Sequence, residues 1–600
     1  MQYSFSERWL LQAGVPVENI KTKRLQGLAR ARRYPMPHRW FYFIFLWITE
    51  WLGPLFILFR FSKAGNLSKS TFDIYLKCLR EHRISYIQIM GVFVLAPLKE
   101  AIIEKEPPKA WKHPLSGLDL GKDIDTEGHS DVIIIGSGAG GAPAALELSR
   151  KGMSVTIIEK GDILESGTAP RILEKYYIGQ GLTLSYNGGM LLVLAGNTVG
   201  GTTSINSGTC LRPLKECLAL WDQQLGTHFA EGELDLFMDR VESQIGVCVP
   251  SRSLFSKSSE LFEKGLNALN RPGAYVLPRY APECTGSGRC CFGCPTGAKQ
   301  STDYSYLPQA VKAGARLLIN TKVIKIDERK DKVLVKIKSS EGERLLSCKT
   351  LIISGGALFT PGLLKRNRLG SKLSQVGKHL KIHPANKVYA WFPDHFHGEG
   401  GIPQGLGYHP PELPFITFEG IHTPKSLTAP ILSVSGKAFN WWLERTAYLS
   451  SFGLMVRDRG EGSLFELNSF PWIRYKLHPE DAKDMIAGDI LIAKAFFAAG
   501  AKRVLLPFVG KWKKEFDDPK ELEELRPDRM GLKSLVVSGF HPQGTAGMGR
   551  VVDADLKLIG SDRIYVCDAS VLPDSPGVNP QVTIMALSLR LADKLKLNFQ

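Results

Sequence analysis

Hydrophobic positions along this 600-residue chain follow three patterns, and each pattern predicts a different kind of element. Short continuous apolar runs, such as Val132–Ile135 and Ile564–Val566, are typical of strands buried on both faces of a parallel sheet. Alternating apolar and charged residues over Lys332–Lys338 predict a strand with one covered face. The third pattern is an apolar run over residues 40–59, about 20 residues long, which is the length of a helix that crosses a hydrocarbon core.

The first of these runs opens a nucleotide-binding βαβ unit. A glycine motif follows the strand, then a helix rich in Ala and Leu, then a second strand over Ser154–Ile158 that ends at Glu159. The motif glycines, in G-x-G-x-x-G spacing, are Gly136, Gly138 and Gly141. The first permits a tight turn, the second lets the backbone approach a pyrophosphate, the third allows close helix packing, and Glu159 would accept hydrogen bonds from ribose hydroxyls. The glycines alone would also fit a structural turn, but the complete unit predicts a dinucleotide site.

Five further segments carry a family resemblance. They are GNTVGGTTSINSGTCLRP (196–213), LIISGGALFTPGLL (351–364), VGKHLKIHP (376–384), HPQGTAGMG (541–549) and PGVNPQVTIMALSLRLAD (576–593). In this order they resemble the glucose-methanol-choline (GMC) family of FAD-dependent oxidoreductases. The resemblance implies an α/β fold, α+β overall, in which a doubly wound, Rossmann-like FAD-binding domain carries an inserted antiparallel-sheet substrate domain. It also implies that the dinucleotide is FAD rather than NAD, and that the protein is an alcohol dehydrogenase or oxidase.

The same motifs divide the chain into discontinuous parts, although its length alone would suggest several consecutive domains. We expect an N-terminal membrane-associated region with a linker over residues 1–125, an FAD-binding domain from 126–214, 305–375 and 535–600, and a substrate domain from 215–304 and 376–534. A strand over Ser534–Ser538 should lead into the segment that begins at His541.

Oxidation of an alcohol by a flavin needs a group that takes the hydroxyl proton while a hydride leaves carbon for flavin N5. The resemblance places His541 over the isoalloxazine ring as that base. Asn579 matches the position where the family has a second histidine or an asparagine. An amide cannot act as a base, so Asn579 would hold the substrate oxygen and stabilise the developing alkoxide. His383 would be structural or support this pair.

Further flavin contacts follow from the resemblance. They are Gly200, Gly201, Thr203 and Asn206 beside the isoalloxazine and ribityl chain, Val323 at adenine, and Asp568 with Thr583 at the pyrophosphate or ribityl hydroxyls. A purely structural role for Val323 remains an alternative.

Four of the ten cysteines lie in one short segment, CTGSGRCCFGCP. Three closely spaced thiolates on a loop of small residues that ends at Cys-Pro are typical of an iron-sulfur site. A disulfide, free thiols or a zinc site are the alternatives. The spacing of Cys284, Cys290 and Cys294 resembles that in bacterial FAD sugar dehydrogenases of the family, which implies a [3Fe-4S] cluster. Cys291 departs from that pattern, and the segment also resembles long-chain fatty alcohol oxidases, for which no cluster is implied.

Charge and the N-terminal region point to a membrane surface as a partner. The net charge is +17, but no nucleic-acid-binding motif is present, and basic residues are attracted to anionic headgroups. Basic residues precede the apolar run and favour a cytoplasmic N-terminus: Lys21, Lys23, Arg24, Arg30, Arg32, Arg33 and Arg39. Export through a twin-arginine signal at Arg32-Arg33 is the alternative.

The apolar run itself allows more than one arrangement. Glu50 lies at its middle, where an ionised carboxylate would cost about 2.5–3.5 kcal/mol at bilayer depth. Its aromatic residues suit a segment that lies in the membrane interface or forms a shallow broken hairpin, and a hydrophobic helix capping the catalytic body is the alternative. Residues 70–97 are expected to form one or two amphipathic helices.

These features predict FAD-dependent oxidation of a hydroxyl in a hydrophobic substrate, such as a long-chain alcohol or sterol, with a quinone, a cytochrome or oxygen as electron acceptor. A sugar or polyol is the alternative substrate. An electron-transfer flavoprotein subunit and a flavin-binding scaffold without activity are rival functions, and both are disfavoured because His541 and Asn579 are present.

Overall fold

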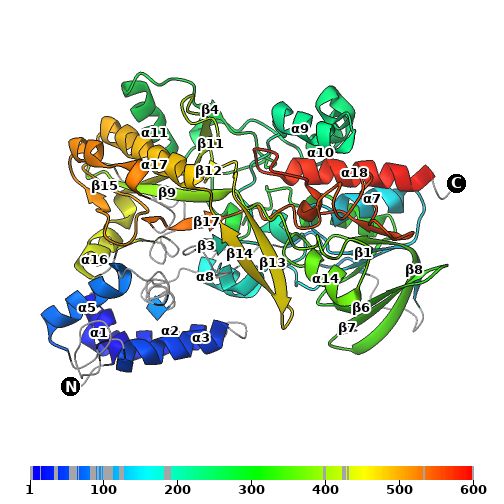
Figure 1. Ribbon diagram of the computed structural model, residues 1–600, viewed down its shortest axis with the longest axis horizontal. Helices are drawn as coiled ribbons and strands as arrows, with labels where there is room; N and C mark the ends of the chain where they lie inside the picture. Colours follow the sequence, from blue (N-terminus) through cyan, green and yellow to red (C-terminus); the bar gives the residue numbers. More distant parts are fainter. Residues whose placement is uncertain are drawn as a thin grey trace.

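The computed structural model is a mixed α/β structure with two main sheets (Figure 1). It describes residues 4–597 except 14, 33–37, 53, 55–63, 65–66, 82–89, 91–93, 96–97, 99–111, 121–127, 166, 182–184, 186–190, 396–399, 422–427, 429–431, 435 and 531–533.

The first sheet is the predicted nucleotide-binding sheet. Its described strands are β1 (His129–Ile135), β2 (Val155–Ile158), β5 (Arg316–Leu318), β6 (Lys322–Glu328), β7 (Val333–Ser339), β8 (Gly342–Ile353) and β18 (Ile564–Val566). The order is β5-β2-β1-β8-β7-β6, with β18 also paired to β8. β1 pairs in parallel with both β2 and β8, and its apolar residues Val132–Ile135 are buried. The predicted strands of this sheet are confirmed to within a residue at each end, except that β1 begins at His129, three residues before the predicted start at Val132.

Helices cover the first sheet and fix the glycine turn. They are α7 (Gly141–Arg150), α10 (Asp235–Gln244), α13 (Leu307–Lys312), α14 (Thr360–Asn367) and α18 (Gln581–Leu597). The hydroxyl of Ser588 in α18 donates to the carbonyl of Gly140 and accepts from the Ala144 N–H, at 2.5 and 3.0 Å. The C-terminal helix is thereby bound to the start of α7, more than 400 residues earlier in the chain.

The second sheet is mostly antiparallel. Its described strands are β3 (Leu191–Val193), β4 (Tyr275–Val276), β9 (Pro384–Trp391), β10 (Leu406–Tyr408), β11 (Ile416–Gly420), β12 (Leu449–Val456), β15 (Arg503–Leu505), β16 (Glu515–Phe516) and β17 (Val537–Gly539). Two helices, α11 (Lys257–Ala268) and α17 (Pro479–Ala499), cover it (Figure 1). They approach closely at Gly265, where a side chain would collide with the Ala495 carbonyl. A hairpin of β13 (Glu461–Leu467) and β14 (Phe470–Lys476) projects from this part of the molecule.

β17 joins the region before His541 to the second sheet. It pairs in parallel with β3 and antiparallel with β9. The predicted strand over Ser534–Ser538 is displaced by three residues at its start, because the pairing of β17 with β3 begins only at Val537. β3 and β17 come from segments predicted for the FAD-binding domain yet belong to the sheet of the other domain, and the predicted domain boundaries stay predictions.

The N-terminal region packs on the second sheet. Its described helices are α1 (Phe5–Gln12), α2 (Ile20–Arg32), α3 (His38–Trp47), a π-helical turn (Ile48–Leu52) and α5 (Lys69–Glu81), and they lie along the lower left of Figure 1. Their core includes Phe5, Trp9 and Tyr75, together with Leu449 and Leu505 of the second sheet. In this part of the chain no described helix has both the length and the apolar character needed to span a membrane. Residues 55–59 of the predicted apolar run, and most of residues 82–97, lie outside the described residues.

Candidate active site

A cavity of about 1020 Å³ lies between the two sheets, at the upper end of the size of ligand pockets. Its walls come from the glycine turn after β1, from the ends of β2 and β8, from the segment after β17 and from strands of the second sheet. One end is therefore built from the dinucleotide motif, and the other from apolar side chains of the second sheet.

The glycine turn has room for a pyrophosphate at one position only. A Cβ at Gly136, where φ is +104°, would lie 2.2 Å from the Ser354 carbonyl oxygen, and a Cβ at Gly140 would lie 1.7 Å from the Cys567 carbonyl oxygen. At Gly138 the nearest protein atom would be 3.8 Å away. Gly138 thus faces open space in the cavity, whereas Gly136 and Gly140 are required by backbone packing.

The third motif glycine serves the helix and does not line the cavity. A Cβ at Gly141 would lie 2.0 Å from the Gly136 carbonyl oxygen, so this glycine allows α7 to start directly above the turn. Gly140, which the motif leaves unassigned, lines the cavity instead.

The two predicted acidic contacts line the cavity. The Glu159 carboxylate accepts hydrogen bonds from the Ser137 N–H and hydroxyl, at 3.0 and 2.7 Å, and from the Gly161 N–H at 2.7 Å. A carboxylate has further lone pairs, which leaves acceptor capacity for a ribose hydroxyl. Asp568 is buried, which raises its pKa, and it accepts from the Gly356 N–H at 2.9 Å and the Thr360 hydroxyl at 2.6 Å.

The predicted flavin-contacting residues are mostly brought together. Gly201, Thr203, Asn206 and Val323 all line the cavity. Gly200 does not, because its position is filled by Ser204 and Asp303, and its φ of +84° serves the turn. Thr583 is fully buried in α18 and does not line the cavity either, so its predicted contact with the cofactor is not supported.

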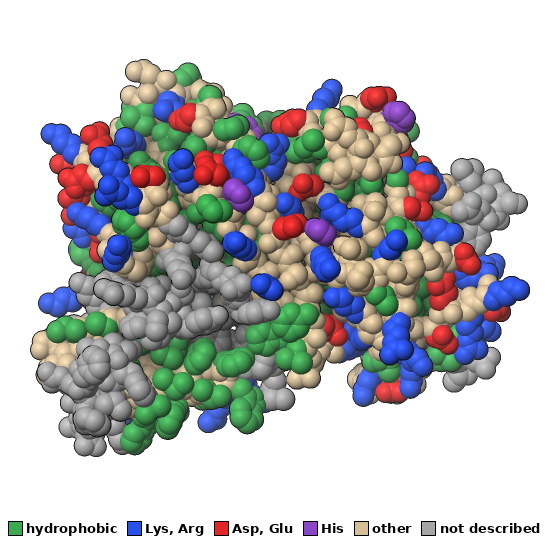
Figure 2. All heavy atoms as spheres, in the orientation of Figure 1, with side chains coloured by type: hydrophobic (Ala, Val, Ile, Leu, Met, Phe, Trp, Pro, Cys, Tyr) green, Lys and Arg blue, Asp and Glu red, His purple; other side chains and the backbone are tan. Residues whose placement is uncertain are grey.

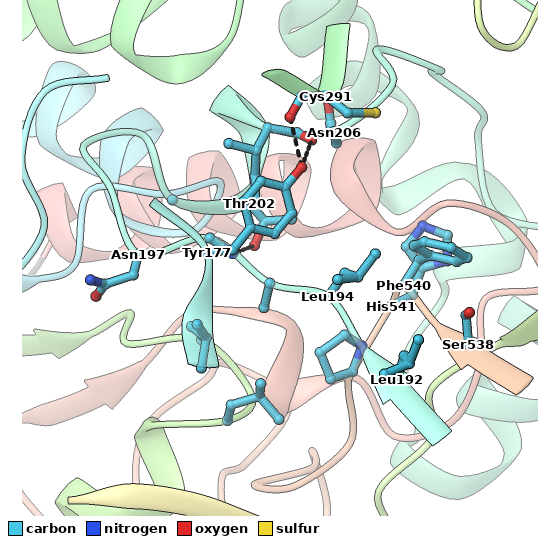
Figure 3. A pocket seen from close by; sticks show the side chains of 18 of the residues that line it. Tyr177, Leu192, Leu194, Asn197, Thr202, Asn206, Cys291, Ser538, Phe540 and His541 are labelled. Atoms are coloured by element: carbon cyan, nitrogen blue, oxygen red, sulfur yellow. Dashed lines mark hydrogen bonds between the residues drawn. The ribbon is translucent and has the colours of Figure 1, made fainter. Parts of the chain in front are cut away.

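The predicted catalytic pair meets in the cavity. The Nε2 atom of His541 lies 3.3 Å from Nδ2 of Asn579, although the two residues come from different loops. His541 is held by its backbone N–H, which donates to the Ile382 carbonyl at 3.1 Å. Figure 3 shows Phe540 and His541 side by side at one wall, with Leu194 pointing toward them.

A hydrogen-bond chain behind His541 sets its tautomer. Nδ1 of His541 lies 3.0 Å from Nδ1 of His383, and Nε2 of His383 lies 2.5 Å from the Ser575 hydroxyl and 3.0 Å from the Gln543 amide. Gln543 Oε1 has no partner as placed, so turning this amide lets it accept from His383 Nε2–H. We assign the proton of His541 to Nδ1, which donates to His383. The Nε2 lone pair of His541 then faces Asn579 and the cavity.

Burial tunes this base. It lowers the pKa of His541 from 6.5 to about 4, and it lowers the pKa of His383 well below its usual range, with the neighbouring His541 adding to the effect. His541 therefore stays neutral at neutral pH, and its Nε2 lone pair is available as an acceptor. The predicted supporting role of His383 agrees with its contact, and its backbone φ of +50° shows that the neighbouring chain holds it in a conformation that residues other than glycine rarely adopt.

Sequence reasoning missed Glu419 on β11. Its buried carboxyl lines the cavity, accepts from the Gln404 amide at 3.0 Å and hydrogen-bonds with Asn579. Burial raises the pKa of Glu419 to about 7, while the two amides lower it. Glu419 is thus placed to orient the Asn579 amide beside His541. No local motif marks it, because it lies 160 residues before Asn579 in the chain.

We expect the ionisation of Glu419 to appear in the pH profile. The ionised carboxylate accepts from Asn579 more strongly than the protonated form, so kcat/KM for the alcohol should rise with pH through about 7. In Glu419→Gln this rise should vanish, and the rate above pH 7 should fall roughly tenfold because a hydrogen bond to a charged group is lost. A pH titration of both proteins, at matched flavin content, measures this. The same rise in the variant would assign the titration to another group.

Two cavity residues that sequence reasoning also missed are cationic. Lys160 directly follows Glu159, its ammonium lies 2.9 Å from the centre of the Phe359 ring, and burial lowers its pKa to about 7. Burial likewise lowers the pKa of Lys387 on β9 to about 7. Lys160 could have been suspected from its position next to Glu159, the predicted ribose contact, but nothing in the sequence marks Lys387.

The structure does not support the predicted iron-sulfur site. Among the residues that it describes, which include the whole Cys loop, no three His, Cys, Asp or Glu residues are placed to hold a metal ion. Each predicted ligand has its own contact: Cys290 accepts from Arg279, Cys284 from the Gly286 N–H, and Cys294 lies 3.4 Å from the Thr296 hydroxyl. Cys291, the residue that departs from the spacing, is the one that lines the cavity. Sequence spacing does not determine where thiols point on an irregular loop, and we derive no step through a cluster.

Comparison with known proteins identifies relatives for most of the chain. Two GMC oxidoreductase family models match residues 173–385 and 467–588, and an FAD binding domain model matches residues 131–170. An uncharacterised GMC-type oxidoreductase of Mycobacterium tuberculosis is 32% identical over 491 residues, which are 79% of this chain and 77% of that protein. A long-chain-alcohol oxidase of Arabidopsis thaliana is 28% identical, covering 83% of this chain and 73% of its own length.

Solved structures share the fold. Pyridoxine 4-oxidase from Mesorbium loti superposes with a TM-score of 0.58 at 16% identity, over 77% of this chain and 98% of its own. Formate oxidase of Aspergillus oryzae superposes with a TM-score of 0.56, also at 16% identity, over 79% of this chain and 99% of its own. The glycine cradle around Gly138 and the acids Glu159 and Asp568 fit the FAD that these comparisons imply.

Proposed function

The chain belongs to the GMC oxidoreductase family, and from this premise we propose that it oxidises the hydroxyl group of a hydrophobic alcohol, with FAD as the hydride acceptor and oxygen as the final electron acceptor. The observation that carries the proposal is the neutral His541, whose Nε2 lone pair and the Asn579 amide face the same part of an apolar cavity.

The pair His541 and Asn579 would act on the alcohol hydroxyl. The Asn579 amide orients the hydroxyl oxygen, and Nε2 of His541 removes its proton. Bound FAD supplies flavin N5 as the acceptor of the hydride that leaves the carbinol carbon. His383 accepts from His541 Nδ1–H and holds the ring in place, so the new imidazolium keeps this hydrogen bond.

The walls beyond this pair favour a hydrophobic substrate. Apolar side chains from five segments of the chain line the cavity: Leu95, Leu192, Leu194, Leu432, Val434, Leu505, Leu506 and Leu535. A sugar or polyol would leave several hydroxyls without partners against these walls, which costs free energy for each group. Long-chain-alcohol oxidases are among the relatives, and the activity in their name supports both the substrate class and oxygen as acceptor.

The test is a series of primary alcohols of increasing chain length, with a sugar as comparison. We expect kcat/KM to rise by roughly threefold to fourfold per methylene until the cavity is filled, since each buried CH₂ contributes about 0.8 kcal/mol. Each alcohol oxidised to the aldehyde should consume one O₂ and release one H₂O₂, which an oxygen electrode and a peroxide assay measure together. A sugar oxidised faster than any alkyl alcohol would refute the substrate class. Flavin that is reduced by alcohol but not reoxidised by oxygen would refute the acceptor.

A further inference from the structure

The helix α3 and the turn after it expose an aromatic stripe. Trp40, Ile44, Trp47 and Trp51 follow at intervals of four, three and four residues, so they share one face of the helix, and their exposed fractions are 63%, 43%, 54% and 47%. Large side chains at this level of exposure are unusual for a face that meets only water.

The opposite face of the same helix is fixed against the protein. Tyr42 is fully buried, and the Tyr75 hydroxyl donates to the Thr49 carbonyl at 2.6 Å. The Glu50 carboxylate accepts the Phe5 N–H at the start of α1, where helix N–H groups favour a negative charge. Glu50, which would oppose burial of this segment in a bilayer, is therefore turned inward, and the stripe is held outward.

The β13–β14 hairpin extends this surface. Phe41 lies edge-on to Trp472, with ring centres 6.2 Å apart, and Phe465 stacks on Trp472 at 6.3 Å. Phe465 and Leu467 are also exposed. Figure 2 shows the hydrophobic side chains gathered along the lower edge of the molecule, over α3 and up to this hairpin. We call the whole surface the aromatic face; it consists of Trp40, Phe41, Ile44, Trp47, Trp51, Phe465 and Leu467.

Basic residues lie close in sequence to several members of the aromatic face. Arg39 directly precedes Trp40 in the chain. Arg474 follows Trp472 by two residues, so Trp472 and Arg474 lie on the same face of β14. α2 adds Lys21, Lys23, Arg24, Arg30 and Arg32 and contains no acidic residue. Exposed Trp with a basic border matches the headgroup region of a membrane that contains anionic lipids.

We propose that the aromatic face docks onto the surface of a bilayer that contains anionic lipids, with α3 lying in the plane of the headgroups, and that the alcohol substrate is taken from this bilayer. The uptake of the alcohol from the bilayer rests on the proposed function. The described helix over residues 38–52 is about 22 Å long, shorter than a hydrocarbon core of about 30 Å, which suits a helix lying in the interface.

The N-terminal region connects the docking surface to the cavity. Leu95 forms part of the cavity wall and belongs to the same hydrophobic core as Phe5 and Tyr75. Tyr389 and Leu432, from the predicted substrate domain, belong both to this hydrophobic core and to the cavity wall. The region that would rest on the bilayer thus also contributes Leu95 to the cavity wall.

Vesicle sedimentation of the full-length, FAD-bound protein tests the docking. Wild type should bind vesicles of phosphatidylcholine with phosphatidylserine more strongly than vesicles of phosphatidylcholine alone. The W40S/W47S double variant should lose roughly tenfold or more in binding, because interfacial affinity follows buried apolar area. The matched control is L220S/L236S, two residues at 53% and 65% exposure on α9 (Lys215–Leu225) and α10, which should bind like wild type. R39E/R474E should lose the preference for phosphatidylserine.

Equal binding by W40S/W47S and the control L220S/L236S, or no binding by wild type, would overturn the docking. The docking would also be overturned if light scattering showed a wild-type dimer that does not bind vesicles and that the W40S/W47S substitutions convert to a monomer. A second copy of the chain would then cover the aromatic face. Flavin absorbance confirms that each variant is folded.

A second measurement separates docking from substrate delivery. W40S/W47S should oxidise a short, soluble alcohol at the wild-type rate, while its oxidation of a long-chain alcohol dissolved in vesicles should fall by the same factor as vesicle binding. An unchanged rate on the vesicle-borne alcohol would overturn the delivery and leave docking in place. If no alcohol reduces the flavin of any variant, the proposed function fails, and sedimentation still decides the docking.

Discussion

His541→Ala should retain FAD yet slow the reduction of the flavin by alcohol about 100-fold to 10,000-fold, the usual contribution of a positioned general base. The histidine contacts Asn579 and His383 at the apolar end of the cavity, away from the glycine turn, so its removal leaves the dinucleotide cradle intact. Rapid mixing under anaerobic conditions measures flavin reduction directly. Asn579→Ala should cost less, because it removes an oriented hydrogen bond and leaves the base.

The pH dependence of the same step gives an independent check on His541. A base works only when deprotonated, and burial lowers its pKa from 6.5 to about 4, so the working form should persist down to about pH 4 to 5. Measured in Glu419→Gln, which lacks the titration near pH 7, a loss of rate centred at pH 6.5 would show a solvent-exposed histidine instead. His228→Ala, which removes an exposed histidine beside Glu231, is the control and should match wild type. Wild-type reduction kinetics in His541→Ala would remove His541 from the mechanism.

The sequence predicts the parts of this molecule whose signals are local. The strand, the three glycines and Glu159 lie within 30 residues, and the chemistry of each follows from its neighbours in the chain. His541 and Asn579 lie in short motifs, so the resemblance located both, and the structure places their side chains 3.3 Å apart.

Features that depend on tertiary contacts were not predicted. Glu419 reaches the catalytic pair because β11 pairs with β12 in a sheet whose register no local pattern records. The start of β17 was misplaced because its partner strands β3 and β9 lie far earlier in the chain. The Cys loop gave a prediction that the fold does not support. The spacing of Cys284, Cys290 and Cys294 predicted three thiols around one metal cluster, but in the folded loop each thiol contacts a different neighbour.

Glu50 shows the same limit in the N-terminal region. Along the chain it interrupts an apolar run and argues against insertion in a membrane. In the fold it accepts the Phe5 N–H, a partner 45 residues away, so the charge is paired inside the protein and the aromatic residues are left outside. Periodicity alone shows that a helix has two faces, and only the contacts show which one is covered.

Substitutions in the glycine turn should separate cofactor binding from folding. A Cβ at Gly138 would lie 3.8 Å from the nearest protein atom, at an ordinary contact distance, but inside the space assigned to the pyrophosphate. Gly138→Ala should therefore fold normally without cofactor and lose about 10-fold to 100-fold in FAD affinity, the equivalent of roughly 1–3 kcal/mol of overpacking. Activity should fall at limiting FAD and recover in part when FAD is added in excess.

Gly140→Ala is the contrasting variant, because its Cβ would lie 1.7 Å from the Cys567 carbonyl oxygen and the backbone itself would have to move. It should fail to fold stably with or without FAD, which thermal unfolding and circular dichroism would show. Titration of the apoprotein with FAD measures the affinity of Gly138→Ala. Wild-type FAD affinity in Gly138→Ala would place the pyrophosphate elsewhere in the cavity. A stable, FAD-binding Gly140→Ala would show that the glycine turn is less tightly packed against Cys567, the residue that follows β18.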